Sequence, residues 1–321
     1  MSGFAYHVDG AGKATKCEIK QALDIARGLV WVHLSTNNEH AQDWLTNVAK
    51  LDDYLVEGLT ANETRPRCEQ FGEGALINLR GRAAEGEDKL PTSDLLASVR
   101  IWAIDGRVIS VSRKKLTAVD LVEQCVKAGS VLDPGDLITE FATAITTDLD
   151  PDVADLGDDL DQCETELGEE KIFELRRTVT RVRVQAIGYR RFLAPQRTAL
   201  EKLSTLQVDW LADDDRLHLS GAADRAARMA EELESIRERA ALTHEALTDL
   251  RAEQLDQRGL IISIIAMIFL PLTFLTGLYG MNVRGLWLAD QPWAFDAIVG
   301  ICLLTAAGVT TYFVRQHWIR G

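Results

Sequence analysis

The segment LIISIIAMIFLPLTFLTGLYGM, residues 260–281, decides the fold because it is the most apolar stretch of the chain. Its 22 residues contain no charged side chain. A helix rises about 1.5 Å per residue, so the segment would span roughly 33 Å, enough to cross a hydrocarbon core of about 30 Å. We therefore expect a first transmembrane helix that runs into Tyr279-Gly280-Met281-Asn282.

A second span is expected at residues 294–314, where the only charge is Asp296 near one edge. The connection between the spans is short and contains Arg284 and Asp290. A buried hairpin of core helices is the alternative, but two such lengths in tandem exceed what a soluble core usually contains. We therefore predict a transmembrane hairpin over residues 259–321. Two helices cannot enclose a water-filled pore, so a conducting protein would assemble several subunits; otherwise the hairpin is an anchor.

The flanking charges predict the orientation. Arg251 and Arg258 precede the first span and Arg315 and Arg320 follow the second, against one arginine in the loop. The positive-inside tendency then places both termini in the cytoplasm and the loop outside. The N-terminus, MSGFAYHVDG, has no signal-peptide pattern, which agrees with a cytoplasmic body. Five cysteines without a C-x-x-C pair indicate unpaired thiols in a reducing compartment.

Net charge and missing motifs exclude several classes of function. The chain carries −14 and residues 261–321 carry +1, so residues 1–260 carry −15. Such an acidic body argues against nucleic-acid binding, which needs basic side chains on phosphates, and suits a body that attracts cations or stays soluble. The sequence has no P-loop, no G-x-G-x-x-G, no G-x-S-x-G and no H-x-x-x-H pair. We therefore expect no enzyme and no tightly bound cofactor.

Residues 1–150 predict a cytoplasmic α/β domain. Apolar runs at 29–35, 74–81 and 98–116 read as strands, and Asp105-Gly106 within the last run is a strong hairpin signal. Helical spacing occupies residues 38–51, 117–129 and 135–149. These alternating patterns indicate a sheet with helices packed on it.

Residues 151–258 predict a helical stalk. Residues 152–207 have helical spacing, with apolar positions at Leu156, Leu160, Leu167, Leu175, Val179, Val182 and Ile187, and residues 209–221 read as a turn. A heptad seam follows, from Met229 through Leu247 to Gln254, so one helix is expected from about Ala222 through Met281. Eleven acidic residues and no basic one lie between Asp148 and Glu170. They read as a solvated helix start or as a surface that concentrates cations.

Within the first span, small or weakly polar residues recur at steps of four and three, near one helical face. They are Gly259, Ser263, Ala266, Leu270, Thr273, Gly277 and Gly280. Such a face packs against another helix or lines a narrow pore with apolar constrictions. Asn282 offers a neutral oxygen that could bind the water shell of a divalent ion, whereas helix termination is the simpler use of Gly280-Met281-Asn282.

The sequence Tyr279-Gly280-Met281-Asn282, at the end of the first of two C-terminal spans, resembles the signature of the CorA superfamily of divalent-cation transporters. The acidic α/β body and the long stalk extend this resemblance over essentially the whole chain. Residues 65–81 and the run at 98–116 look like the zinc-transporter (ZntB) branch. The resemblance implies a CorA-like homopentameric funnel in a bacterial inner membrane, with both termini cytoplasmic.

The resemblance also implies roles for residues. Gly280, Met281 and Asn282 would form the selectivity entrance at the outer mouth. The pore would be lined by the first span, at Thr273, Leu270, Gly277, Ala266, Ser263 and Ile262. Arg284 and Asp290 would modulate the mouth, and we expect Arg284 to pair with Asp290 or to point outward. No resident metal site is assigned. The transported ion would be Zn²⁺, taken up with or without proton coupling, with Mg²⁺, Co²⁺, Ni²⁺ and Cd²⁺ as further cargo.

Two departures bear on the ion. The magnesium branch typically follows its signature with Met-Pro-Glu-Leu, whereas residues 283–287 here are VRGLW, which argues against a standard magnesium channel. The zinc branch has valine or isoleucine where Met281 stands, and its Gly-Gly-Ile-Pro-like loop is missing. The hypotheses are therefore a zinc transporter, a CorA-type Mg²⁺ channel and, from a different class, a membrane-anchored coiled-coil scaffold or sensor. A membrane-bound enzyme comes last.

Overall fold

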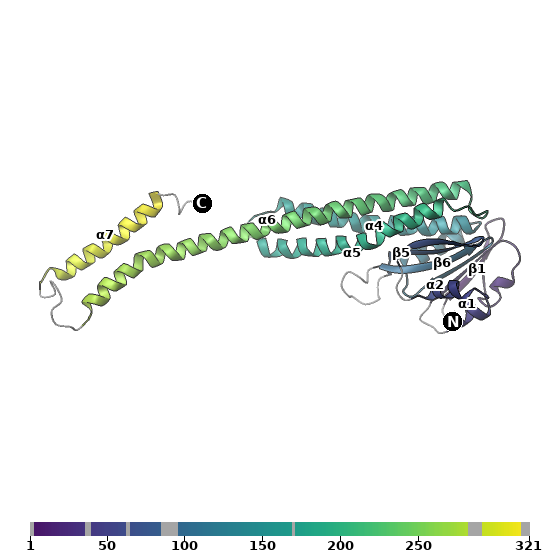
Figure 1. The fold of residues 1–321 in the computed structure, drawn as a ribbon, viewed down its shortest axis with the longest axis horizontal. Coiled ribbons are helices and arrows are strands. Elements are labelled where there is room, and N and C mark those ends of the chain that lie inside the picture. The colour runs from purple at the N-terminus through teal and green to yellow at the C-terminus, as the bar shows by residue number, and fades with distance from the viewer. Residues whose placement is uncertain are drawn as a thin grey trace. The chain divides into compact units, whose positions relative to one another are not determined.

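The computed structural model describes residues 3–35, 40–61, 65–84, 96–168, 171–281 and 291–315. The chain forms two compact units: Met1–Leu167 with Phe173–Glu245, and Gly168–Ile172 with Ala246–Gly321. Figure 1 labels the elements within them. The first unit contains the sheet and most of the helical stalk, and the second contains the apolar helical segments.

A seven-stranded mixed sheet forms the centre of the first unit. Its strands are β1 (Gly3–Val8), β2 (Ala14–Cys17), β3 (Leu29–Ser35), β4 (Arg67–Phe71), β5 (Gly74–Arg82), β6 (Leu96–Ile104) and β7 (Arg107–Ser112). They lie in the order β2-β1-β3-β7-β6-β5-β4. Only β3 and β7 pair in parallel; every other neighbouring pair is antiparallel.

The three strand regions expected from the sequence are confirmed. β3 covers residues 29–35, β5 begins at Gly74, and the run at 98–116 contains β6 and β7. The expected hairpin joins these last two strands, with Ile104 opposite Arg107 and only Asp105-Gly106 between them. Gly106 has φ 64°, a left-handed backbone conformation that glycine adopts without strain.

Helices cover both faces of the sheet. One face packs against η1 (Ala22–Asp24), α1 (His40–Asn47) and α2 (Asp53–Thr60), around a core that includes Trp44 and Trp102. The other face packs against α3 (Thr117–Ala128) and α4 (Pro134–Thr165). There the Trp31 ring meets Phe141 of α4 edge to face at 5.7 Å. Large buried aromatic rings on both faces fix the three-layer arrangement.

Helices α4, α5 (Ile172–Ser204) and α6 (Asp213–Tyr279) form a bundle in the first unit, where Figure 1 shows them side by side. Each contributes a buried seam at steps of four and three. In α6 the seam is the predicted one, buried at Met229, Leu233, Ile236, Ala240, Thr243 and Leu247. In α5 it runs through Leu175, Val179, Val182, Ala186, Tyr189, Leu193, Gln196, Leu200 and Leu203.

Two of the apolar positions of the helical pattern are exposed rather than buried in this bundle. Ile187 is exposed because Ala186 occupies the seam position on that turn of α5. Leu167 is exposed because it follows the end of α4 at Thr165. The remaining predicted positions, Leu156, Leu160, Leu175, Val179 and Val182, are buried.

The acidic run is not a helix start, which corrects one of its two interpretations. α4 begins at Pro134, so residues 148–165 form its second half. Arginines from other elements meet these carboxylates: Arg82 contacts Asp152, and Arg181 of α5 lies 2.9 Å from Asp159. The run therefore joins helices to each other and to the sheet, and arginines neutralise part of its charge inside the chain.

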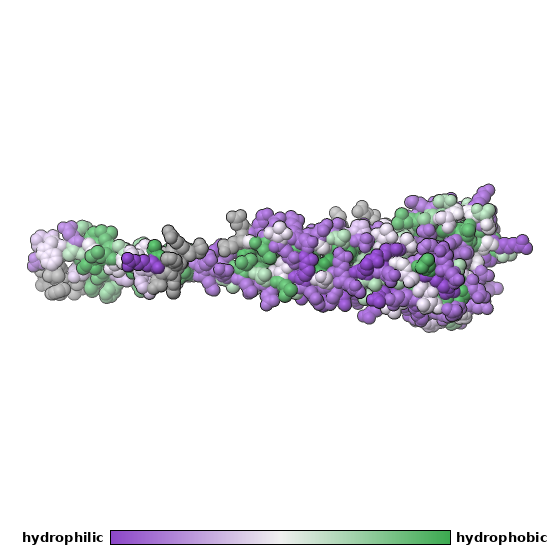
Figure 2. Space-filling view, turned by 90° about the horizontal axis from the view of Figure 1, so that it is seen from above, coloured by the Kyte–Doolittle hydropathy of each residue, from purple (hydrophilic) through white to green (hydrophobic). Residues whose placement is uncertain are grey.

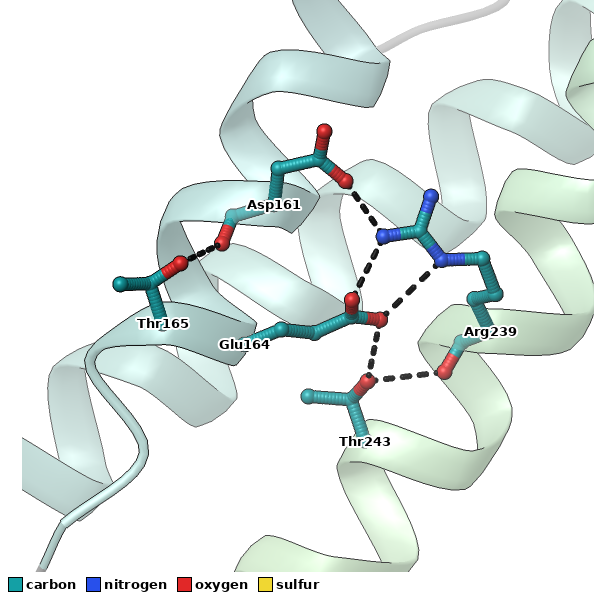
Figure 3. A network of polar contacts seen from close by, with 5 residues as sticks. All are labelled: Asp161, Glu164, Thr165, Arg239 and Thr243. Atoms are coloured by element: carbon teal, nitrogen blue, oxygen red, sulfur yellow. Dashed lines mark hydrogen bonds and ion pairs between the residues drawn. The ribbon is translucent and has the colours of Figure 1, made fainter.

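The densest of these contacts joins α4 to α6. Figure 3 shows the Arg239 guanidinium between Asp161 and Glu164. Its Nη2 donates to Asp161 and, at 2.5 Å, to Glu164 Oε2, while Nε donates to Glu164 Oε1 at 3.3 Å. Thr243, one turn further along α6, donates its hydroxyl hydrogen either to Glu164 at 3.2 Å or to the Arg239 carbonyl oxygen at 2.8 Å. The fork geometry of arginine thus links two carboxylates of one helix to another helix.

The turn expected at residues 209–221 is also wrong from Asp213 onward, because α6 begins there. Asp213, Asp214 and Asp215 occupy its first turn, where negative charge stabilises exposed amides. Asp215 accepts a hydrogen bond from the Ala212 amide at 2.9 Å, in the manner of a capping box. Arg216 supports the preceding loop because it donates to the carbonyls of Leu206, Val208 and Leu211, among others.

The contact between α4 and α6 can be tested with Arg239→Met, which keeps the apolar stem and removes the guanidinium. Because Arg239 stays 39% exposed, we expect a loss of only about 1 kcal/mol, a fall of about 2–4 °C in Tm. The matched control, Arg228→Met, removes an exposed arginine of the same helix and should leave Tm unchanged. Thermal unfolding of the full chain in detergent measures both; equal Tm values for the two variants would contradict this role.

Asp215 lies within 4.8 Å of Asp133 and Asp136, and its burial and their charges raise its pKa. A carboxyl whose folded pKa is raised costs stability when ionised, and this cost disappears as the pH falls through the raised pKa. Asp215→Asn keeps an oxygen for the Ala212 amide and removes the charge that burial and the neighbouring aspartates disfavour, so we expect Tm at pH 7 to rise. The gain should shrink as the pH is lowered toward the carboxyl range. A lower Tm at pH 7 would contradict this account.

Candidate functional site

The predicted pore-lining residues lie on the last six turns of α6. The helix continues without a break through Pro271 to Tyr279. Proline lacks an amide hydrogen and is tolerated within membrane helices more readily than in soluble ones. The structure therefore places the predicted residues on one continuous helix, as expected.

All six of these residues are exposed in the single chain: Ile262, Ser263, Ala266, Leu270, Thr273 and Gly277. Leu270 is 76% exposed and Ile262 is 67% exposed. Another strip of the helix, through Ile264, Ile268, Leu272 and Leu275, is buried or half-buried. The helix thus has an accessible face of small, hydroxyl and apolar side chains. Their role in a pore stays a prediction.

The hydroxyl groups on this helix share one geometry. Ser263 donates to the Gly259 carbonyl at 2.9 Å, and Thr273 donates to the Phe269 carbonyl at 2.7 Å. Each hydroxyl hydrogen is therefore used within the helix, and the oxygen keeps lone pairs that can accept further hydrogen bonds. An oxygen of this kind can accept from the water shell of a cation, which is what a cation pathway requires.

The helix ends next to Gly280-Met281, where the sequence predicts helix termination. The Gly280 amide donates to the Thr276 carbonyl at 2.9 Å, and the Met281 amide donates to the Leu278 carbonyl at 3.4 Å, which closes the last turn. Met281 is 48% exposed. Asn282, Arg284 and Asp290 lie outside the described residues, so the predicted entrance is described here only at Gly280 and Met281.

Exposure also decides between a membrane hairpin and a soluble core. In the apolar part of α6 the only buried residue is Ile264, and among the described residues of α7 (Ala294–Arg315) it is Phe313. Both helices are long and apolar enough to span a membrane. Figure 2 shows hydrophobic residues gathered on these segments, whereas hydrophilic residues cover most of the α4–α6 bundle. Core helices would be buried, so the alternative of a buried hairpin is wrong.

The structure brings together one acidic cluster in the first unit that the sequence analysis did not predict. Asp133, Asp136 and Asp215 offer three carboxylate oxygens within 4.8 Å of one another. Each also caps a helix end or loop: Asp133 accepts from the Asp136 amide at 2.9 Å and Asp136 from the Leu132 amide at 2.8 Å. The residues fit a capping role at the starts of α4 and α6, which explains their proximity. The pattern of aspartates flanking a Pro-Gly helix start was the signal that could have located them.

Comparisons with known proteins connect this architecture to a family. Residues 26–315 match the family described as CorA-like Mg²⁺ transporter protein. The zinc transport protein ZntB of Pectobacterium atrosepticum is 30% identical over 316 residues, which cover 98% of this chain and 95% of that protein. The structure of the full-length CmaX protein superposes with a TM-score of 0.80 at 28% identity, over 98% of both chains.

The CorA magnesium transporter of Methanocaldococcus jannaschii has a TM-score of 0.79 over 99% of both chains, and at 17% identity it shows the shared fold alone. The expected fold is confirmed: an α/β domain, a long helix and C-terminal transmembrane helices. The chain is a membrane protein of a divalent-cation transport family, whose members are not enzymes. It therefore belongs to the CorA-like Mg²⁺ transporter family.

Proposed function

We propose that this chain assembles as a homopentamer in the bacterial inner membrane and carries Zn²⁺ into the cytoplasm through a central pore lined by the last part of α6. The observation that carries the proposal is the accessible face of α6, which contains small, hydroxyl-bearing and apolar side chains and leads to Tyr279-Gly280-Met281-Asn282. In a single chain the side chains of this face are exposed. Several copies arranged around an axis would bring these faces together to line a pore.

The chemistry of this face suits a hydrated divalent ion. Mg²⁺ and Zn²⁺ lose their water shell only at high cost, so a passage that offers neutral oxygens binds the shell without trapping the ion. Thr273 offers such an oxygen, since its hydrogen is already donated to Phe269. Gly280 and Asn282 would form the entrance. Leu270 would form an apolar constriction that conducts ions only when water fills it.

The proposed roles of the three regions of the chain follow the domain boundaries expected from the sequence. Residues 1–150 would form the cytoplasmic domain, residues 151–258 the stalk and residues 259–321 the membrane hairpin. Both termini would lie in the cytoplasm, because arginines flank the spans on that side. Arg284 would pair with Asp290 or point toward lipid headgroups, since a ring of unpaired arginines would repel cations at the mouth.

Zinc is favoured over magnesium by two observations. A relative similar over nearly its whole length is a zinc transport protein. Residues 283–287 are VRGLW and contain no acidic residue that could attract Mg²⁺ after the signature. The second candidate, a Mg²⁺ channel that also admits Co²⁺ and Ni²⁺, is favoured by the description of the matching family. Cd²⁺ would follow zinc because it prefers similar ligands.

The proposal is tested with Asn282→Ala in the full chain, reconstituted into proteoliposomes that contain a zinc-sensitive dye. Loss of a ring of amide oxygens at the entrance should lower Zn²⁺ flux at least about tenfold, which corresponds to about 1.4 kcal/mol. The matched control, Asn47→Ala, removes an exposed asparagine of α1 and should keep the wild-type flux. Runs with and without a pH gradient show whether protons contribute.

Three results would overturn parts of this account. Unchanged flux in Asn282→Ala would remove the entrance assignment. Mg²⁺ uptake that outcompetes Zn²⁺ and is blocked by cobalt hexaammine, a mimic of hydrated magnesium, would establish the second candidate. A dimeric or trimeric mass in detergent with no metal flux would instead indicate a membrane-anchored scaffold or sensor.

A further inference from the structure

One strip of α5 presents large apolar side chains and arginines to solvent. Val184 and Ile187, three residues apart on one face of the helix, are each 48% exposed. Arg183 and Arg191 lie about one turn before and after Ile187, and both are exposed. Among the described residues, neither arginine forms an ion pair. Neighbouring β-branched side chains flanked by arginines are typical of a surface that another protein covers. These four residues are called the α5 strip.

A strip of α4 has the complementary character. Asp150, Ala154 and Asp158 recur every four residues, and all three are exposed. Within the described part of the chain these two aspartates form no ion pair, whereas Asp152 and Asp159 each contact an arginine. Ala154 is small and leaves room for a larger side chain opposite it. The α4 strip, Asp150, Ala154 and Asp158, therefore has negative charge at both ends and a small apolar residue between them.

The two strips match in register. Within one chain, α4 and α5 lie side by side and run in opposite directions (Figure 1). The Tyr189 hydroxyl donates to Asp152 at 3.3 Å, so these two residues lie at the same level of the bundle. Both helices rise equally per residue, so Arg191, two residues after Tyr189, is level with Asp150, two residues before Asp152. The same count gives the other level pairs of the two strips: Ile187 with Ala154, and Arg183 with Asp158.

We infer that the α5 strip of one copy docks on the α4 strip of the neighbouring copy, and the inference rests on the ring of copies that the proposed function requires. A rotation about an axis parallel to α4 and α5 leaves every residue at its own level. The level pairs within one chain then become contacts between chains. Ile187 packs over Ala154, between two arginine–aspartate pairs. Each chain carries both strips, so this head-to-tail contact repeats from copy to copy until the ring closes.

The docking is tested with Ile187→Cys and Ala154→Cys made together in the full chain. Oxidation of membranes with copper phenanthroline should join neighbouring copies and give a ladder of masses up to the closed ring on a non-reducing gel. Each single substitution is a control and should match wild type, because a head-to-tail contact brings position 187 to position 154. Ile187→Cys with Thr165→Cys is the matched control. Its second thiol lies about 16 Å further along α4, at another exposed position, so it should form no ladder.

Charge reversal provides a second test that leaves the cores of the subunits undisturbed. Arg191→Asp places like charges opposite each other in every contact and should lower the assembled fraction in detergent several-fold. Asp150→Arg added to the same chain should restore assembly, because each contact again joins opposite charges. The native mass of the protein in detergent measures both effects. An unchanged mass distribution in Arg191→Asp would count against the docking.

Failure of the docking and failure of the proposed transport are distinguishable, because Zn²⁺ flux is measured on the same double-cysteine protein after reduction. A ladder without flux would support the docking and remove the transport. Flux without a ladder would overturn the docking and keep the transport. A cross-linked dimer from either single substitution would also overturn the docking, since it would show a two-fold contact between identical strips.

Discussion

The continuity of α6 is the constraint on which the rest of the structure depends. One helix runs from Asp213 to Tyr279, so the same backbone serves a water-exposed bundle and an apolar span. Up to Thr243 its seam is buried in the helical bundle of the first unit. From Gly259 onward its residues are mostly exposed and apolar. Each part requires a different environment, one in water and one in an apolar phase.

Arginines form ion pairs with the acidic residues of α4. The carboxylates of α4 would repel one another along their helix, yet Arg82, Arg181 and Arg239 each contact one or more of them. Individually such pairs contribute little at the surface. Together Arg181 and Arg239 join α4 to α5 and α6, and Arg82 joins α4 to the sheet. The acidic run at residues 148–170, which the sequence analysis interpreted as a surface that could concentrate cations, thus partly serves to hold elements of the chain together.

Local patterns in the sequence predicted local structure well. The Asp105-Gly106 hairpin, strand β3 and the α6 seam follow from spacing and turn chemistry, which involve only neighbouring residues. The parallel pairing of β3 with β7 was not predicted, because strands distant in sequence meet only through the tertiary fold. The start of α6 was placed too late, since three consecutive aspartates resemble a turn as much as a helix cap.

The central claim is that the exposed face of α6 near Thr273 lines a cation pathway. Cysteine accessibility tests this directly, with Thr273→Cys and Leu304→Cys each made in a Cys302→Ser background and reconstituted in proteoliposomes. Leu304 is a control because it is 75% exposed on α7, outside the proposed pore. A cationic, membrane-impermeant thiol reagent should abolish most of the Zn²⁺ flux of Thr273→Cys and leave that of Leu304→Cys unchanged. Equal block of both variants, or of neither, would contradict the account.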